Sequence, residues 1–158
     1  MSQITDAMIC EHAIAALERT AFVLAEAAED PAAAEGFAPT LHTCIGYQGV
    51  ANGSIVLAAD DDFVRELASS MLGIEADAVC APTTGLDALN ELANIIGGSI
   101  IVDLGGESQR YRYGLPTPLA SDSVPESTPT TVSTLVRSET GMLGIRWIPG
   151  LQPERLAA

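Results

Sequence analysis

Asp87, Glu91 and Asn94 stand at helical spacing within residues 84–98 and carry the functional groups that a binding or catalytic site needs. Residues at positions i, i+4 and i+7 of an α-helix lie on one face, so the three side chains form one polar stripe. A carboxylate offers negative charge, whereas a carboxamide offers both a hydrogen-bond donor and an acceptor. The spacing therefore predicts that an acid and an amide are presented together to a partner.

The helix that must position this stripe is predicted over residues 84–104. Its other face is apolar at helical spacing and would anchor it in a core, through Leu89, Ala93, Ile96 and Ile100. Thr84-x-x-Asp87 loosely matches a capping box at the start of the helix. Gly97 and Gly98 follow no strand and lack nucleotide-binding spacing, so they favour close packing of the helix over a phosphate loop.

Each member of the stripe also has a plainer interpretation. Glu91 and Asn94 could belong to an ordinary solvated helix face. Asparagine has poor helix propensity, however, which favours a role other than helix stability for Asn94, and Asn90 shares this feature. An acid in the first turn stabilises a helix terminus, so Asp87 is interpreted as a helix-start residue more than as a contact residue.

The remaining segments predict further helices and strands. Helices are expected at 5–29 and about 60–73, and strands at 40–48, 54–59, 130–137 and 142–148. Residues 119–129, rich in Ser, Pro and Thr, indicate an exposed loop, and residues 149–158 indicate a tail. The order suggests an internal duplication of a helix and its strands. Aligning the two long helices places Ala21 where the second helix has Asn94.

Length and charge bound the class of protein. With 158 residues, of which 47% are hydrophobic, the chain is expected to form a single domain over residues 1–158. The formal net charge is −14, and all seven basic residues are arginines. Because so acidic a surface repels phosphate backbones, nucleic acid is not expected as a partner.

The N-terminal residues lack the basic and apolar regions of a secretion signal, which favours a cytoplasmic protein. No apolar run approaches the roughly 20 residues that span a bilayer, so membrane insertion is not expected. The three cysteines are odd in number and far apart in sequence, as expected of free thiols in a reducing compartment.

Cys10-x-His12 and His42-x-Cys44 contain the ligand types that zinc prefers. Residues i and i+2 of a helix point about 200° apart, however, so Cys10 and His12 do not readily face one ion. Core cysteines and surface histidines are the favoured interpretation, and a zinc metalloprotein is the alternative. No metal site of the chain's own is predicted.

Asp87-x3-Glu91-x2-Asn94, followed by Ile-Ile-Gly-Gly and by Gly114-Leu-Pro116, resembles the signature of the CheC/CheX/FliY chemotaxis phosphatases and is most similar to the CheX branch. The segment of residues 46–57, which reads as a hairpin punctuated by Gly46, Gly49 and Gly53, and the amphipathic first helix are similar to that family as well. The resemblance implies an α/β fold of the α+β type. In this CheC-like fold, duplicated helix-plus-strands units pack long helices on a largely antiparallel sheet.

The resemblance also implies a hydrolase, a protein phosphatase that removes the aspartyl phosphate of a CheY-type response regulator in chemotaxis or two-component signalling. Glu91 would pair with the regulator's active-site lysine, and Asn94 would orient the attacking water. Asp87, Asn90 and Glu91 would contact the regulator. The family implies a homodimer and no cofactor of the chain's own, because the metal would belong to the regulator. The alternative is a non-catalytic scaffold or switch component, which the missing amide at Ala21 supports.

Overall fold

The computed structural model describes residues 3–49, 51–105 and 111–151 and is built around a seven-stranded sheet. The strand order is β1-β6-β7-β3-β2-β4, and β5 also pairs with β2. All these pairs are antiparallel. The strands are β1 Glu26–Ala27, β2 Leu41–Gln48, β3 Gly53–Ala59, β4 Arg112–Tyr113, β5 Thr117–Leu119, β6 Val132–Arg137 and β7 Met142–Pro149.

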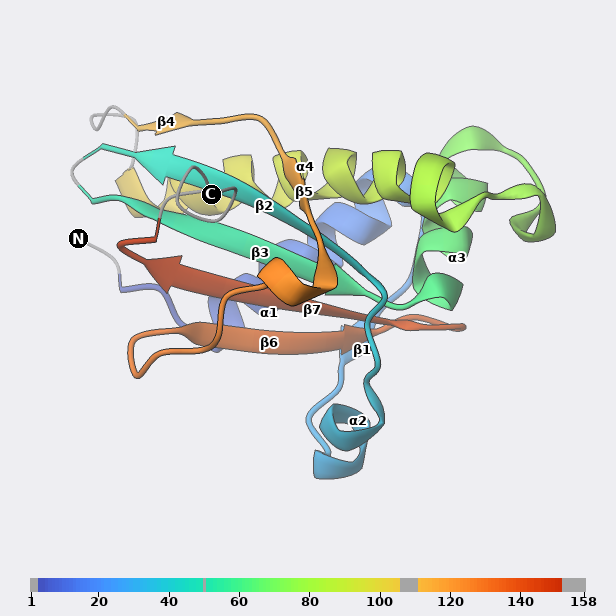
Figure 1. Ribbon diagram of the computed structural model, residues 1–158, viewed down its shortest axis with the longest axis horizontal. Coiled ribbons are helices and arrows are strands. Elements are labelled where there is room, and N and C mark those ends of the chain that lie inside the picture. The colour runs from blue at the N-terminus through green and yellow to red at the C-terminus, as the bar shows by residue number, and fades with distance from the viewer. Residues whose placement is uncertain (1–2, 50, 106–110, 152–158) are drawn as a thin grey trace.

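Long helices cover one face of this sheet, which confirms the predicted fold class (Figure 1). The helices are α1 Asp6–Ala16, α2 Pro31–Gly36, α3 Asp61–Leu72 and α4 Leu86–Gly105. A π-helical turn, Leu17–Ala21, extends α1, and another, Ala81–Gly85, precedes α4. None of the helices formed by the described residues is long and apolar enough to cross a membrane.

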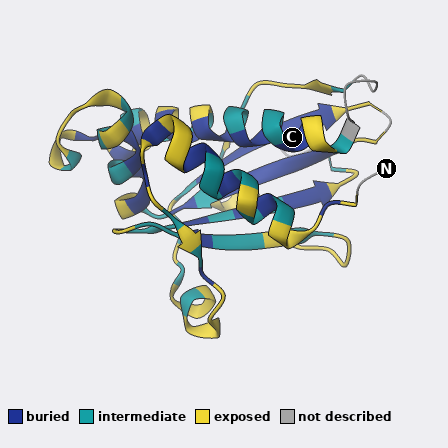
Figure 2. Ribbon diagram, turned by 180° about the vertical axis from the view of Figure 1, so that it is seen from behind, coloured by how far each residue is buried: buried dark blue, intermediate teal, exposed yellow. Residues whose placement is uncertain are grey.

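The core lies between the sheet and the helices because alternate strand residues point to opposite faces. Ile45 of β2 and Ile55 of β3 pack under the helices, whereas Cys44 and Val56 face the other side. Figure 2 shows the strands buried behind the helices, whose outward sides are exposed. The predicted apolar face of α4 is confirmed, since four of its side chains are fully buried: Leu89, Ala93, Ile96 and Ile100.

The topology has the form that the predicted duplication would produce. One unit comprises α1, β1, β2 and β3, and the other comprises α4, β4, β6 and β7. The short strand of each unit pairs with the hairpin of the other, β1 with β6 and β4 with β2. The two hairpins meet in the centre, where β3 pairs with β7.

The predicted first helix is wrong beyond residue 21. Phe22 adopts a left-handed backbone conformation with φ 55°, and its N–H donates to the Leu17 carbonyl, which closes the helix. The chain then forms β1 against β6, which satisfies backbone groups that an edge strand would leave unpaired. Leu24, which the helical spacing places on the apolar face, is instead 75% exposed.

Three smaller expectations also change. The predicted capping box does not form, because Thr84 lies inside the π-helical turn, which has no side-chain cap. The predicted loop at 119–129 begins within β5 and holds a short 3-10 turn, Ser121–Ser123, and its Val124 packs on the outer face of the sheet. The tail is predicted over residues 149–158, but Pro149 is the last residue of β7. Residues 152–158 lie outside the described residues.

Candidate functional site

Helix α4 is fixed to strand β2 on both sides of Asn94. One turn before Asn94, the buried Thr43 hydroxyl donates a 2.6 Å hydrogen bond to the carboxamide oxygen of Asn90. One turn after it, Gly97 lies so close to the sheet that a Cβ there would stand 3.2 Å from the Ile45 side chain. This contact confirms the close packing predicted for Gly97. The backbone that carries Asn94 is therefore held between two fixed points.

The far end of α4 is joined to α1 by a network that the sequence reasoning missed. The ring of His12 lies 2.5 Å from the Ser99 hydroxyl through Nδ1 and 2.5 Å from an Asp103 carboxylate oxygen through Nε2. These partners are 87 and 91 residues from His12 in sequence, so no local sequence pattern predicts these contacts. Rotation of α4 about its own axis would change the direction in which the polar stripe points, and the network limits that rotation.

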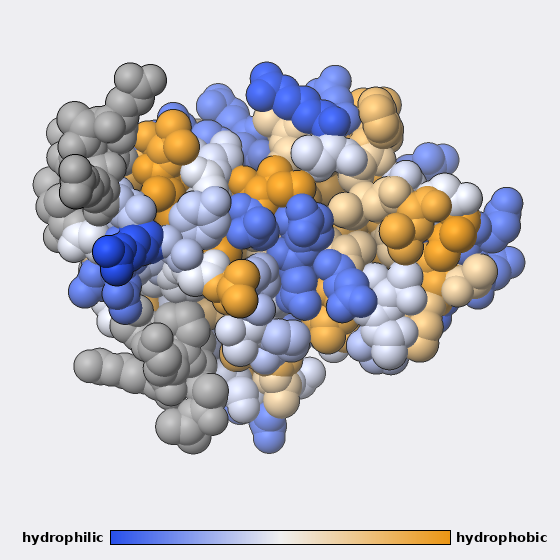
Figure 3. All heavy atoms as spheres, turned by 90° about the horizontal axis from the view of Figure 1, so that it is seen from above, coloured by the Kyte–Doolittle hydropathy of each residue, from blue (hydrophilic) through white to orange (hydrophobic). Residues whose placement is uncertain are grey.

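The polar stripe faces outward from α4. Asp87 and Glu91 are exposed, and Asn94 is half-buried. Among the described residues, none hydrogen-bonds or ion-pairs with the side chains of these three. Asn90 differs, because its amide oxygen turns toward Thr43. Figure 3 shows hydrophilic residues gathered over the middle of this upper face, with hydrophobic residues on both sides of them.

This arrangement can serve a partner that brings its own reactive group. A free carboxylate offers charge to a cation, and a free carboxamide one turn later can hold a water molecule. Among the described residues, no group of three or more His, Cys, Asp or Glu could hold a metal ion. The open surface suits a macromolecule better than a small molecule, which favours concave sites.

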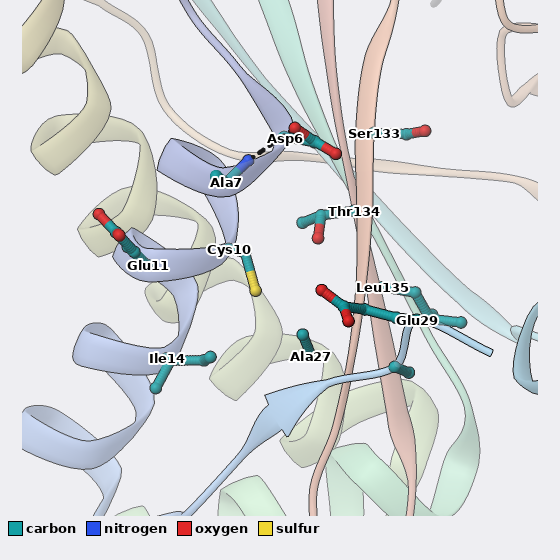
Figure 4. A pocket seen from close by; sticks show the side chains of 11 residues that line it. Asp6, Ala7, Cys10, Glu11, Ile14, Ala27, Glu29, Ser133, Thr134 and Leu135 are labelled. Atoms are coloured by element: carbon teal, nitrogen blue, oxygen red, sulfur yellow. Dashed lines mark hydrogen bonds between the residues drawn. The ribbon is translucent and has the colours of Figure 1, made fainter.

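A concave pocket does exist, but at the opposite edge of the sheet. It encloses about 510 Å³ between α1, β1 and β6. Figure 4 shows the Cys10 thiol and the Glu29 carboxylate directed toward one another in this pocket, with Asp6 and Glu11 near its rim. The pocket contains no residue of the α4 stripe. The stripe is therefore a separate, open site.

The two candidate zinc pairs lie on opposite sides of the sheet. Cys10 and His12 belong to α1, whereas Cys44 and His42 point to the outer face. Burial lowers the pKa of His42 and raises the pKa of Cys44, because the charged form of each group is poorly solvated there. The nearby Arg146 cation lowers the pKa of His42 further, whereas at Cys44 a hydrogen bond with Ser54 and the Arg146 cation offset part of the rise. The structure does not bring the four side chains together.

The duplicated position in the first helix carries no second site. Glu18 is exposed, but Ala21 is buried at 1% exposure inside the π-helical turn. An acid is therefore present there without an amide beside it. The Glu91 and Asn94 pair on α4 has no equivalent in the first helix.

Comparison with known proteins agrees with this geometry. The family model described as "Chemotaxis phosphatase CheX" matches residues 41–139, more than half of the chain and including the whole stripe. No curated protein sequence matches the chain.

Solved structures share the fold at low sequence identity. A putative chemotaxis protein from Desulfovibrio vulgaris Hildenborough is 17% identical, with TM-score 0.68 over 90% of this chain and 94% of that chain. The chemotaxis protein CheX from Vibrio vulnificus is 15% identical, with TM-score 0.68 over 90% and 93%. A CheX-CheY-BeF3-Mg+2 complex from Borrelia burgdorferi matches at 14% identity and TM-score 0.66, over 90% and 96%.

Proposed function

The chain belongs to the CheX family of chemotaxis phosphatases, and from this premise we propose that it hydrolyses the aspartyl phosphate of a CheY-type response regulator. The observation that carries the proposal is the unpaired carboxamide of Asn94, one turn from the unpaired carboxylate of Glu91 on an anchored helix. The Borrelia burgdorferi neighbour, solved with CheY, BeF3 and Mg+2, supports the same class of partner for this chain.

In the proposed mechanism Glu91 anchors the regulator, and Asn94 positions the attacking water. The Glu91 carboxylate pairs with the active-site lysine of the regulator, and Asp87 extends the negative surface. The Asn94 carboxamide holds a water in line with the phosphorus. That water attacks, the bond between phosphorus and the aspartyl oxygen breaks, and inorganic phosphate leaves. A neutral amide suits this role, because an anionic side chain would repel the phosphoryl oxygens.

Positioning alone is a sufficient contribution from this chain. Phosphoryl transfer gains mainly from orientation and charge stabilisation, and the regulator supplies the phosphoryl group and its metal. The anchoring by Thr43 and Gly97 therefore supports the proposal, because it fixes the backbone from which Asn94 projects. Asn90 shares the surface, but its amide oxygen is already engaged by Thr43.

The decisive experiment measures decay of a phosphorylated receiver domain with and without this protein. Asn94→Ala should reduce the stimulated rate at least about 100-fold, as loss of one well-placed polar group does in other sites. Asn94→Asp, which keeps the shape and adds charge, should be equally inactive. Both variants should still bind the receiver domain. Binding by the wild-type protein without faster decay would instead support the scaffold alternative.

We keep the homodimer as part of the proposal. The last two strands of the chain are β6 and β7. Strand β7 lies inside the sheet, whereas β6 is covered on its outer side by only two residues of β1. The rest of β6 is the strand edge on which a second copy would pair. Light scattering at micromolar concentration tests this, and a monomer mass would contradict it.

A further inference from the structure

The outward face of α4 does not end at Asn94. Continuing the stripe by helical spacing leads to Gly98 and then to Val102, at i+11 and i+15 from Asp87. Val102 is 65% exposed. The face therefore changes along the helix from carboxylates, through the amide, to an apolar end.

A second segment runs beside this face along the edge of the sheet. The segment of residues 112–119, called here the β4–β5 strap, pairs with β2 at both ends, Tyr113 with Tyr47 and Thr117 with Cys44. Between them the Gly114 N–H donates a 2.8 Å hydrogen bond to the Gly46 carbonyl. Figure 1 shows the strap following β2 along the upper edge, with α4 behind it.

The register of the strap places Leu115 level with Asn94. Leu115 lies between the two paired ends, alongside residues 45–46 of β2. The same stretch of β2 underlies the Asn94 turn of α4, because Thr43 bonds to Asn90 and Ile45 packs at Gly97. The strap also meets the helix directly, since a Cβ on Gly98 would stand 3.4 Å from the Tyr113 hydroxyl.

The apolar side chains around this face are exposed although their backbone is well fixed. Leu115 is 86% exposed and Tyr113 is 47% exposed. A single exposed leucine is ordinary, but here Leu115 and Tyr113 lie on the strap that runs beside α4, and Val102 lies on α4 beyond its free acid and amide pair. Exposed apolar side chains beside unpaired polar groups are typical of a docking surface.

We propose that Leu115, with Tyr113 and Val102, forms an apolar arm that docks on the receiver domain of the phosphorylated regulator, next to its phosphoaspartate. The inference rests on the proposed function, because the arm continues the Glu91 and Asn94 surface. It adds that binding and catalysis depend on different residues. Leu115 sets affinity and the choice of regulator, while Asn94 governs the rate of the bound complex.

The charge of the face selects this occupant over a second copy of the chain. A two-fold contact would bring the carboxylates of Asp87 and Glu91 toward the same carboxylates of the partner copy, and like charges repel. A receiver domain that presents a lysine beside an apolar patch complements both parts of the surface. The overall charge of −14 disfavours self-association through this face in the same way.

The test compares Leu115→Asp with Leu24→Asp. Both leucines are exposed, but Leu24 precedes β1 at the opposite edge of the sheet and serves as the matched control. Receiver domains from the organism that encodes this chain, activated with beryllofluoride and Mg²⁺, are the binding probes. Leu115→Asp should weaken binding about tenfold or more, and Leu24→Asp should bind as the wild type does. At saturating protein, Leu115→Ala, which removes the apolar side chain without adding a charge, should dephosphorylate the acetyl-phosphate-labelled domain at the wild-type rate.

The outcomes separate the arm from the proposed function. If the wild type binds and dephosphorylates a receiver domain but Leu115→Asp has unchanged affinity, the docking role of the arm is contradicted and the proposed phosphatase function is not. If the wild type binds none of the activated domains, both are wrong. A reduced rate at saturation would contradict the separation of binding from catalysis. As a direct check, benzoylphenylalanine at position 115 should cross-link to the activated receiver domain and lose the cross-link when beryllofluoride is omitted.

Discussion

The hydroxyl of Thr43 on β2 donates a 2.6 Å hydrogen bond to the carboxamide oxygen of Asn90 on α4. Thr43 is fully buried and Asn90 is half-buried, so this bond lies at the margin of the core. It lies one helical turn from Asn94, and it fixes both the height and the rotation of the helix over the sheet. Asn90, one of the three residues that the family resemblance assigns to the regulator contact, thus also secures the helix.

Loss of this hydrogen bond should lower stability. Thr43→Val keeps the β-branched shape but removes the donor, and we expect the free energy of unfolding to fall by about 1 kcal/mol. Urea denaturation measures the change. In a double-mutant cycle, Asn90→Ala should cost less in the Thr43→Val background than in the wild type, because the shared bond is already lost. Fully additive effects would show that the two side chains do not interact.

Glu91→Ala should weaken docking without slowing the bound complex. Removing the carboxylate deletes the proposed pair with the regulator's lysine, so KM for the phosphorylated receiver domain should rise about tenfold while kcat is kept. The wild-type KM should also rise with salt, and the variant's much less. Glu18→Ala, the counterpart acid in the first helix, should change neither constant. A fall in kcat with unchanged affinity would contradict the anchoring role.

Phe22 should be replaceable with a gain in stability. A side chain with a Cβ is strained at φ 55°, and the Phe22 ring is 83% exposed, so it contributes little packing. Phe22→Gly should raise the free energy of unfolding by about 1 kcal/mol, or Tm by roughly 2–4 °C. Gly73→Ala is the converse control, because Gly73 ends α3 at φ 68° and alanine there should destabilise. Loss of stability in Phe22→Gly would indicate that the ring makes an undetected contact.

His42 should make stability depend on pH below neutrality. Desolvation, aided by Arg146, lowers the pKa of His42 in the folded protein below its ordinary value of 6.5. The unfolded chain therefore takes up a proton first. The contribution of neutral His42 is fully present above about pH 6.5 and is lost as the pH falls through the folded pKa.

Unfolding free energies between pH 7.5 and 5 test this prediction. The wild type should lose more stability over that interval than His42→Gln, which cannot take up the proton. Asp30, whose pKa is lowered by Arg137 from 3.8, titrates below this interval and does not obscure the comparison. Parallel pH curves for the two proteins would contradict the assignment to His42.

The sequence by itself determined those features that depend on neighbouring residues along the chain. Helical spacing fixes which residues share a face, so it placed Asp87, Glu91 and Asn94 together and buried Leu89 and Ile96. The strands predicted at 40–48 and 54–59 and the helix predicted at about 60–73 follow from equally local rules and are confirmed, with Asp60 and Gly73 as the caps of α3. The same local spacing failed beyond residue 21, because strand pairing with β6 overrides helical propensity there.

Only the tertiary structure decided which polar groups remain free and what surrounds them. Asn90 and Asn94 are asparagines of one predicted helix with the same poor helix propensity, yet Thr43, 47 residues from Asn90, engages one and leaves the other available. The strap that carries Leu115 reaches the helix only because β4 and β5 pair with β2. Such contacts depend on the packing of distant segments, which residue types and spacing do not encode. Helical spacing places the stripe on one face of α4, and packing against β2 engages Asn90 but leaves Asn94 without a partner among the described residues.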